Sequence, residues 1–344
     1  MSDLTLGLAI VGGVALAAVV AHGAWQARKA GPRRAAPLAE PPAAAQMEPV
    51  LTDAALQADA ALLPRGGLRR ASPRLDALID AIATLRPETP LAAETVLAYL
   101  PPTRRVGSKP FLIEGLSAES GEWEPVAAGA QYGELQAGVQ LANRTGALNE
   151  IEYSEFVQKV QAFAEAIGAM AELPDMLDVV SRARELDAFA GERDAQLALT
   201  LQARTSAWSV GYLQQQAAAQ GFVAGIVPGR MVLPAAEDGA PPVLVLSFDA
   251  QAALAEDANA AAVRAATLSF DVAQTDPTGQ PLAAWQASAQ ALALGMDALV
   301  VDDQGRPLTE AGFASIATEL ERLYAALAAH DLAAGSAAAR RLFS

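Results

Sequence analysis

The chain has 344 residues, 52% of them apolar but only 5% aromatic, and a formal net charge of -15. This length suits one or two soluble domains, and an acidic chain is poorly suited to bind a phosphate backbone, so we expect no nucleic-acid partner. Cysteine is absent and histidine occurs only at His22 and His330, which excludes disulfides and thiolate catalysis and leaves almost no material for a metal site or a Ser–His–Asp relay.

Residues 4–25 form an uninterrupted run without charge, LTLGLAIVGGVALAAVVAHGAW. A membrane-spanning helix needs about 20 mostly apolar residues, and this run meets that length. A cleaved signal peptide would carry cations before a shorter apolar core, whereas here the cations Arg28, Lys29, Arg33 and Arg34 follow the run. The pattern therefore predicts a transmembrane helix, with residues 1–3 as a periplasmic tip and the remaining chain in the cytoplasm.

Small residues recur along this predicted span at every fourth position, namely Ala9, Gly13, Ala17 and Ala21. That spacing permits close pairing of two such helices, and so self-association of the chain. The abundance of alanine explains the same spacing without any pairing.

Residues 26–71 are rich in proline, alanine and scattered charges, and we expect a flexible tether whose basic start can lie on anionic lipid headgroups. Residues 72–189 have the pattern of an additional α+β segment that packs on the C-terminal domain. Its first element is an expected helix from Ser72 to Pro87. The other expected elements are strands at 111–116 and 135–143, a helix from Ser154 to Gly168 and a helix at about 175–190.

Residues 190–344 give the clearest pattern, a β-α-β-β-β-α-β-α order. The expected strands are 196–202, 230–234, 243–249, 266–273 and 298–301, and the expected helices are 209–219, 282–294 and one capped by Thr309. Hairpins mixed with helices predict an α+β fold, with a mainly antiparallel sheet of the split β-α-β type and helices on one face. Trp208, Trp285 and Tyr324 stand at helical positions typical of a core.

Several segments of residues 190–344 resemble the ZipA cell-division family in order. These are LALTLQA, the helix that ends in QGF, the hairpin closing PPVLVLSF, the strand ATLSFDV, and GMDALVVDDQGRPLTEAGFASIATEL. The C-terminal stretch HDLAAGSAAARRLFS is similar to that of beta-proteobacterial members. The anchor and tether resemble the same family in plan.

The resemblance implies a membrane anchor of the bacterial division ring, at the inner membrane and the division site, without catalysis or cofactor. In that family the soluble domain binds the C-terminal tail of FtsZ across an open apolar sheet face. Positions that the family fills with large apolar residues are here Gln196, Ala198, Thr200 and Ser269, and Met231, Leu246 and Phe248 would supply apolar area instead. A strand register shifted by one residue would exchange the two faces.

No pattern of catalytic residues stands out in the chain. Asp302 and Asp303 are adjacent acids close to a strand end, but Gly305 and Pro307 follow, which favours a solvated turn over a metal site. Two other functions stay open, namely a membrane-tethered scaffold or envelope factor with a different partner, and a membrane-anchored enzyme, which would need a deep cleft with perturbed titratable groups.

One further pattern concerns the relation between the two soluble segments. LQAGVQLANRTG…VQAFAEAIG is similar in order and spacing to ATLSFDVAQTDPTG…ASAQALALG, since each has the pattern of strand, polar turn, helix and glycine. An old duplication would produce this similarity, and so would chance in an alanine-rich chain.

Overall fold

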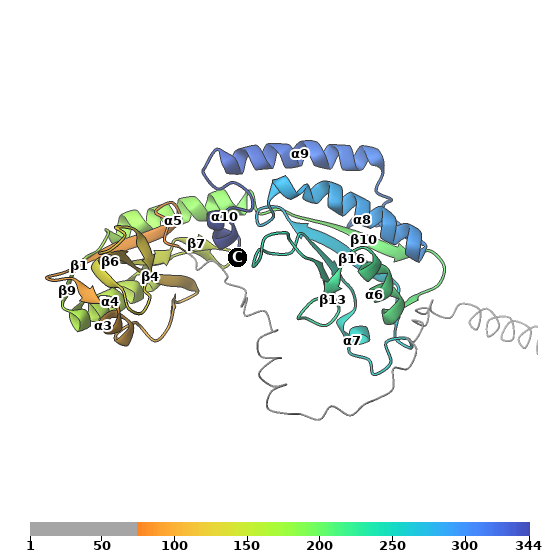
Figure 1. Cartoon of the computed structure of the whole chain (residues 1–344). Helices are drawn as coiled ribbons and strands as arrows, with labels where there is room; N and C mark the ends of the chain where they lie inside the picture. The colour runs from red at the N-terminus through yellow and green to blue at the C-terminus, as the bar shows by residue number, and fades with distance from the viewer. Residues whose placement is uncertain (1–73) are drawn as a thin grey trace, which may run out of the picture.

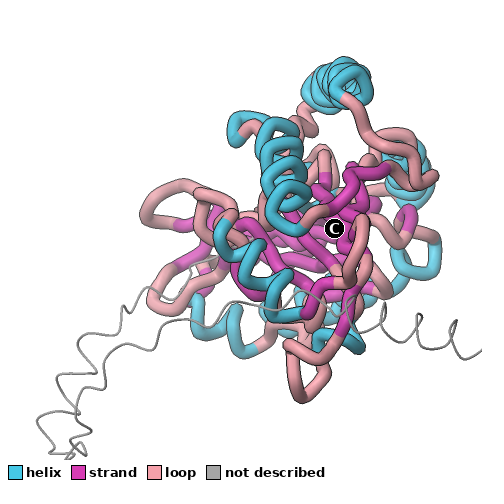
Figure 2. The backbone as a smooth tube through the Cα atoms, turned by 90° about the vertical axis from the view of Figure 1, so that its right-hand side faces the viewer, coloured by secondary structure: helices cyan, strands magenta, loops and turns pink. Residues whose placement is uncertain are grey.

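The computed structural model describes residues 74–344, so the predicted span at 4–25 and the predicted tether at 26–71 lie outside the described residues. Within residues 74–344, no helix is both long enough and apolar enough to cross a membrane. The described chain is a mixed α+β structure in which every paired strand of the two main sheets is antiparallel to its neighbour. In Figure 2 the strands lie in the middle of the molecule, with helices around them.

The first unit, orange to light green in Figure 1, is built on a seven-stranded sheet of order β3-β4-β6-β1-β9, in which β2 also pairs with β6 and β5 with β4. Its strands are β1 (Asp80–Pro87), β2 (Leu91–Ala92), β3 (Arg105–Val106), β4 (Lys109–Ser117), β5 (Trp123–Pro125), β6 (Gln131–Gln140) and β9 (Ala169–Glu172). Its helices are α3 (Ala93–Ala98), α4 (Glu150–Ile167) and α5 (Met176–Gly191), and the small hairpin β7 (Ala142–Asn143) and β8 (Gly146–Ala147) precedes α4.

One face of this sheet is buried under helices. Ala81, Ala83 and Leu85 of β1 alternate along the strand and pair with buried residues of β6. This face packs in one cluster with Phe156 and Val160 of α4. A hydrophobic layer between sheet and helix stabilises the unit because it removes apolar area from water on both sides.

The expected helix from Ser72 to Pro87 is wrong where the structure describes it, because residues 80–87 form strand β1. The apolar residues of this segment fit a helical period, but Ile82 and Thr84 are β-branched and favour extended backbone. Burial of the alternate residues Ala81, Ala83 and Leu85 against α4 then selects the strand. Tertiary packing therefore overrides the local helical spacing.

The second unit, green to blue in Figure 1, is built on a six-stranded sheet of order β12-β13-β14-β16-β10-β17. Its strands are β10 (Gln196–Ala203), β12 (Val223–Ala224), β13 (Arg230–Leu233), β14 (Leu244–Ser247), β16 (Ala265–Asp271) and β17 (Ala298–Val301), and β11 (Trp208–Ser209) pairs with β15 (Ala262–Val263) beside it. Its helices are α6 (Val210–Ala219), α7 (Ala250–Ala253), the short 3-10 turn η1 (Pro277–Gly279), α8 (Pro281–Met296), α9 (Glu310–Ala328) and α10 (Ala337–Leu342).

The two units share one connectivity. The order β4-β6-β1-β9 of the first sheet corresponds to β14-β16-β10-β17 of the second. Helix α4 connects β6 to β9 as α8 connects β16 to β17, and α5 follows β9 as α9 follows β17. The similarity of order and spacing in the sequence is therefore accompanied by the same pairing of these four strands in each sheet.

The units meet through a third buried cluster that draws residues from both. It contains Ile79 and Ala142 of the first unit and, from the second, Ala273, Leu327, Leu332, Ala334, Ala338, Ala339, Leu342 and Phe343. Arg144, after β7, adds a bidentate ion pair with Asp194 and a second ion pair with Asp271, at 2.6 Å each. Helix α10 lies at this junction in Figure 1.

Candidate functional site

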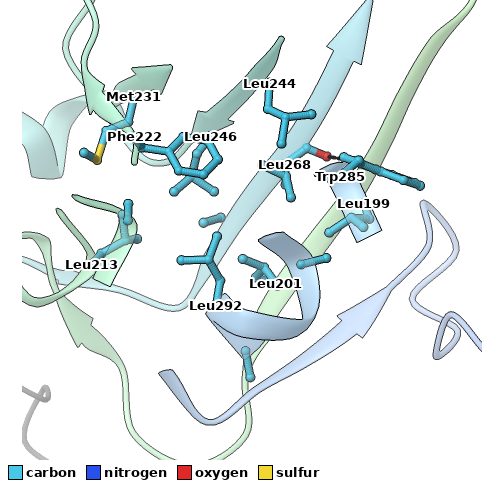
Figure 3. Close-up of a cluster of buried hydrophobic side chains, with 14 of the residues drawn as sticks. Leu199, Leu201, Leu213, Phe222, Met231, Leu244, Leu246, Leu268, Trp285 and Leu292 are labelled. Carbon is cyan, nitrogen blue, oxygen red and sulfur yellow. Dashed lines mark hydrogen bonds between the residues drawn. The ribbon is translucent and has the colours of Figure 1, made fainter. Parts of the chain in front are cut away.

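The second sheet has two unlike faces because its strands alternate. Leu199 of β10, Leu268 of β16 and Leu246 of β14 stand opposite one another in adjacent strands, and side chains of directly opposed residues point to the same face. Figure 3 shows this face filled by Leu213 of α6 and by Trp285 and Leu292 of α8.

Two tryptophans fix the helices of this covered face. The indole N–H of Trp285 donates to the carbonyl of Leu268 at 2.9 Å, and that of Trp208 donates to the carbonyl of Met296 at 2.7 Å. Trp285 also meets Phe313 of α9 edge to face, with ring centroids 5.5 Å apart. Trp208 and Trp285 are thus core residues, as predicted, and they hold α8 and α9 on the covered side.

The other face, here called the outer face of the second sheet, carries a row of small and apolar side chains. Ala198 stands opposite Ser269, Ser269 opposite Val245, and Val245 opposite Val232. Ala198 is exposed, and the other three are half-buried. Thr200, which stands opposite Thr267, lies in the next row of the same face.

The structure divides the predicted partner-binding residues between the two faces. Ala198, Thr200 and Ser269 lie on the outer face, and their role in binding stays a prediction. Met231 and Leu246 do not: they oppose each other on the covered face and are buried in its core. This corrects their predicted place.

Phe248 is half-buried and packs against the edge of the same core, and its role in binding stays a prediction. Both Val245 and Leu246 are apolar, so the sequence alone could not say which of them faces outward. Val245 lies on the outer face and Leu246 is buried, so Val245 and Val232 supply apolar area on the outer face in place of Met231 and Leu246.

Two charged residues of the outer face lie at strand ends, away from its centre. Asp271, at the end of β16, is held by Arg144, and Arg230, at the start of β13, is exposed. The centre around Ser269 is uncharged. Such a face suits an extended segment that contributes a few apolar side chains, because short-range burial and not a row of ion pairs would hold it.

Titratable clusters elsewhere have structural partners. Within residues 74–344, no group of three or more His, Cys, Asp or Glu is arranged to hold a metal ion. The Asp302 carboxylate accepts from the backbone and the side chain of Arg306, and the backbone bond is the main cause that lowers the pKa of Asp302. This is the turn predicted from Gly305 and Pro307.

Lys109 is a buried cation that the sequence did not single out. Its ammonium donates to the carbonyl of Gly146 at 2.6 Å, to Oδ1 of Asn143 at 2.8 Å and to Oγ1 of Thr145 at 3.2 Å. Burial lowers the pKa of Lys109. The ammonium also donates to the hydroxyl of Ser108 at 3.1 Å, and these bonds together fasten β4 to the β7–β8 hairpin.

Comparison of the sequence with protein-family models and with curated proteins finds no match.

Proposed function

We propose that the protein is a membrane anchor of the bacterial division ring that binds the C-terminal tail of FtsZ on the outer face of the second sheet. In this proposal residues 4–25 anchor the chain in the inner membrane as a single pass, with the N-terminus in the periplasm and both units in the cytoplasm at the division site. The protein catalyses no reaction and needs no cofactor in this role.

The observation that carries the proposal is the contrast between the two faces of the second sheet. Helices α6, α8 and α9 share one core with the covered face, whereas Ala198 in the middle of the outer face is exposed. An antiparallel sheet can leave one face to solvent, and adjacent valines such as Val245 and Val232 on such a face favour a protein partner. The order of segments that resembles the ZipA family supports FtsZ as that partner.

The outer-face row gives the expected chemistry of binding. An extended tail would lay apolar side chains over Ala198, Ser269 and Val245, and removal of one such anchor typically weakens binding by about 1 to 3 kcal/mol. The centre of this face is uncharged, so affinity should change little between low and moderate salt.

Calorimetry of the full chain in detergent with a synthetic peptide of the FtsZ tail tests the proposal. Thr200→Arg, which places a long cation on the outer face, should weaken binding at least tenfold. The matched control is Thr84→Arg, because Thr84 occupies the equivalent position in β1 of the first sheet and should leave affinity unchanged. Absence of binding at millimolar peptide would reject the function, and equal affinity of Thr200→Arg and wild type would reject the site.

A further inference from the structure

The first sheet also has an outer face, but here the chain covers it with its own residues Arg74–Asp76, which we call the strap. A Cβ on Gly138, in the middle of β6, would collide with the side chain of Leu75. Gly138 stands between Ile82 of β1 and Leu112 of β4 and points away from the helices. Leu75 of the strap therefore sits in a notch that exists because position 138 has no side chain.

A buried acid lies beside this notch. Glu114 of β4 has a side chain that is 2% exposed, and its carboxylate accepts from Arg74 Nε at 2.7 Å, from the Leu75 amide at 3.0 Å and from Gln136 Nε2 at 3.0 Å. A buried carboxylate without a cation is strongly unfavourable. Among the described residues, Arg74 is the cation in ion contact with Glu114, and the strap supplies it.

The two sheets place this notch and the candidate site of the second unit at equivalent positions. Ile82, Gly138 and Leu112 form one row across β1, β6 and β4, and Ala198, Ser269 and Val245 form the corresponding row across β10, β16 and β14. The strap therefore lies where the second sheet is exposed at Ala198. The position equivalent to Glu114 is Ser247, which is neutral. The outer face of the first sheet therefore favours a cationic group in a ligand, and that of the second sheet does not.

We propose that the outer face of the first sheet is a second peptide-binding site, which the chain fills with its own strap. The site takes from a partner an extended segment in which a basic residue directly precedes a leucine or a residue of similar size. The basic side chain pairs with Glu114, the apolar side chain enters the notch at Gly138, and the amide between them donates to the same carboxylate. This inference does not depend on what the second sheet binds.

The strap is held in a way that permits exchange. It forms no strand pairing, and the side chain of Arg74 is 53% exposed although it is paired. Besides its contacts with Glu114, the strap is fixed by a bond of 2.7 Å from Arg341 to the carbonyl of Arg74, a bond from Arg74 to the carbonyl of Trp123, and a bond of 2.8 Å from the Asp76 amide to Asp80. A cleft of about 830 Å³ borders the strap and is lined on its far side by residues 237–242 of the β13–β14 connection, which leaves room for an incoming segment.

The test uses the full chain in detergent with both substitutions Arg74→Gly and Leu75→Gly. This double variant, here called the emptied variant, removes the side chains that fill the notch. The probe is a fluorescent peptide of residues 72–79, SPRLDALI, and binding is followed by fluorescence anisotropy. The emptied variant should bind the peptide at least tenfold more tightly than wild type. A peptide with glutamate in place of its arginine should bind at least tenfold more weakly than SPRLDALI.

Two further substitutions in the emptied variant locate the site. Gly138→Ala fills the notch and Glu114→Gln removes the charge, and each should lower the affinity at least tenfold. Gly133→Ala, in the same strand, is the matched control, because a Cβ there meets no atom within 4 Å. The proposal is overturned if the emptied variant does not fold cooperatively, if it folds but does not bind the peptide more tightly than wild type, or if Gly138→Ala leaves the affinity unchanged.

Discussion

Arg341 of α10 donates from both terminal guanidinium nitrogens to the carboxylate of Asp80 at the start of β1, at 2.6 and 2.8 Å. The side chain of Asp80 is fully buried and that of Arg341 nearly so. The C-terminal helix of the second unit is thereby fastened to the first strand of the first unit. Burial raises the pKa of Asp80 above its ordinary value, although Arg341 acts in the opposite direction.

We expect Arg341→Ala to lower the free energy of unfolding by about 3 to 5 kcal/mol near neutral pH, because it leaves a buried carboxylate without its cation. Loss of Arg341 raises the pKa of Asp80 further. A carboxyl group whose pKa is raised in the folded state lowers the free energy of unfolding at pH values above that pKa. It has no such effect at acid pH, where the group is protonated in both the folded and the unfolded state. The deficit should therefore shrink as the pH falls toward about 4.

Urea unfolding of the variant at several pH values measures this. Arg322→Ala is the matched control, since Arg322 pairs with Glu319 on the surface, where both side chains are about 70% exposed. Such a pair contributes about 0 to 1 kcal/mol. A deficit in Arg341→Ala no larger than in Arg322→Ala would contradict the importance of the Arg341–Asp80 pair.

Leu246→Ala should destabilise the protein by about 2 to 5 kcal/mol, because the side chain is buried in the core of the second unit and its removal leaves a cavity. It should not weaken binding of a peptide on the outer face, since Leu246 points to the opposite side of the sheet. Unfolding by urea and calorimetry with the FtsZ tail peptide, on the same variant, separate the two effects. A loss of affinity without a loss of stability would return Leu246 to the partner face.

Local signals in the sequence located most elements of the second unit. Thr309 caps α9, with its hydroxyl accepting from the Gly312 amide, and β10, β16, β17 and α6 lie close to their predicted ranges. In the first unit α4 ends at Gly168, as predicted, and this glycine takes a left-handed conformation. Strong caps and clear periodicity are properties of neighbouring residues, so one sequence is enough to read them.

Other helix ends differ from the predicted ones because a neighbouring residue caps the helix instead. The N-cap of helix α4 is Asn149, five residues before the predicted cap Ser154, since Asn149 and Glu152 form a reciprocal capping box. Helix α8 passes through Gly295, where an end was predicted, and Asp297 takes the left-handed conformation instead. Each alternative residue was visible in the sequence, but its advantage over the predicted one was not.

The candidate sites were less accessible to sequence reasoning because they depend on pairing. The run from Val243 to Phe248 is apolar on both sides, so its pattern does not state which residues face outward, and the prediction placed Leu246 on the wrong face. The strap on Glu114 and the Arg341–Asp80 pair join residues that are 40 and 261 positions apart. Such contacts depend on the order of the strands in the sheets, and the spacing of apolar residues within one segment does not determine that order.

The topology of the anchor can be tested in cells. A reporter enzyme that is active only in the periplasm, fused after Ser344, should be silent, because the cations that follow residues 4–25 favour a cytoplasmic location for the chain beyond them. The control is the same fusion with Arg28, Lys29, Arg33 and Arg34 replaced by glutamine, which removes that bias and should raise the signal. A strong signal from the unaltered chain would reject the predicted topology.

Tyr324 of α9 offers a prediction on alkaline stability. Its hydroxyl is buried without a hydrogen-bond partner among residues 74–344, and burial, aided by the negative charge of Asp276, raises its pKa to about 12. A buried polar group without a partner typically costs about 1 to 3 kcal/mol. Tyr324→Phe removes that group and should raise the free energy of unfolding by about 1 kcal/mol at pH 8.

The pH dependence follows from the sign of the same shift. A tyrosine whose pKa is raised by folding contributes stability below its ordinary pKa of 10.0 and loses it as the pH rises toward about 12, because the unfolded state releases the proton first. The advantage of Tyr324→Phe over wild type should therefore grow between pH 10 and pH 12, as measured by urea unfolding. Tyr212→Phe is the contrasting control, since the Tyr212 hydroxyl donates to the carbonyl of Gly295 at 2.7 Å and its removal should destabilise the protein. If Tyr324→Phe is less stable than wild type at pH 8, its hydroxyl has a partner and the argument is wrong.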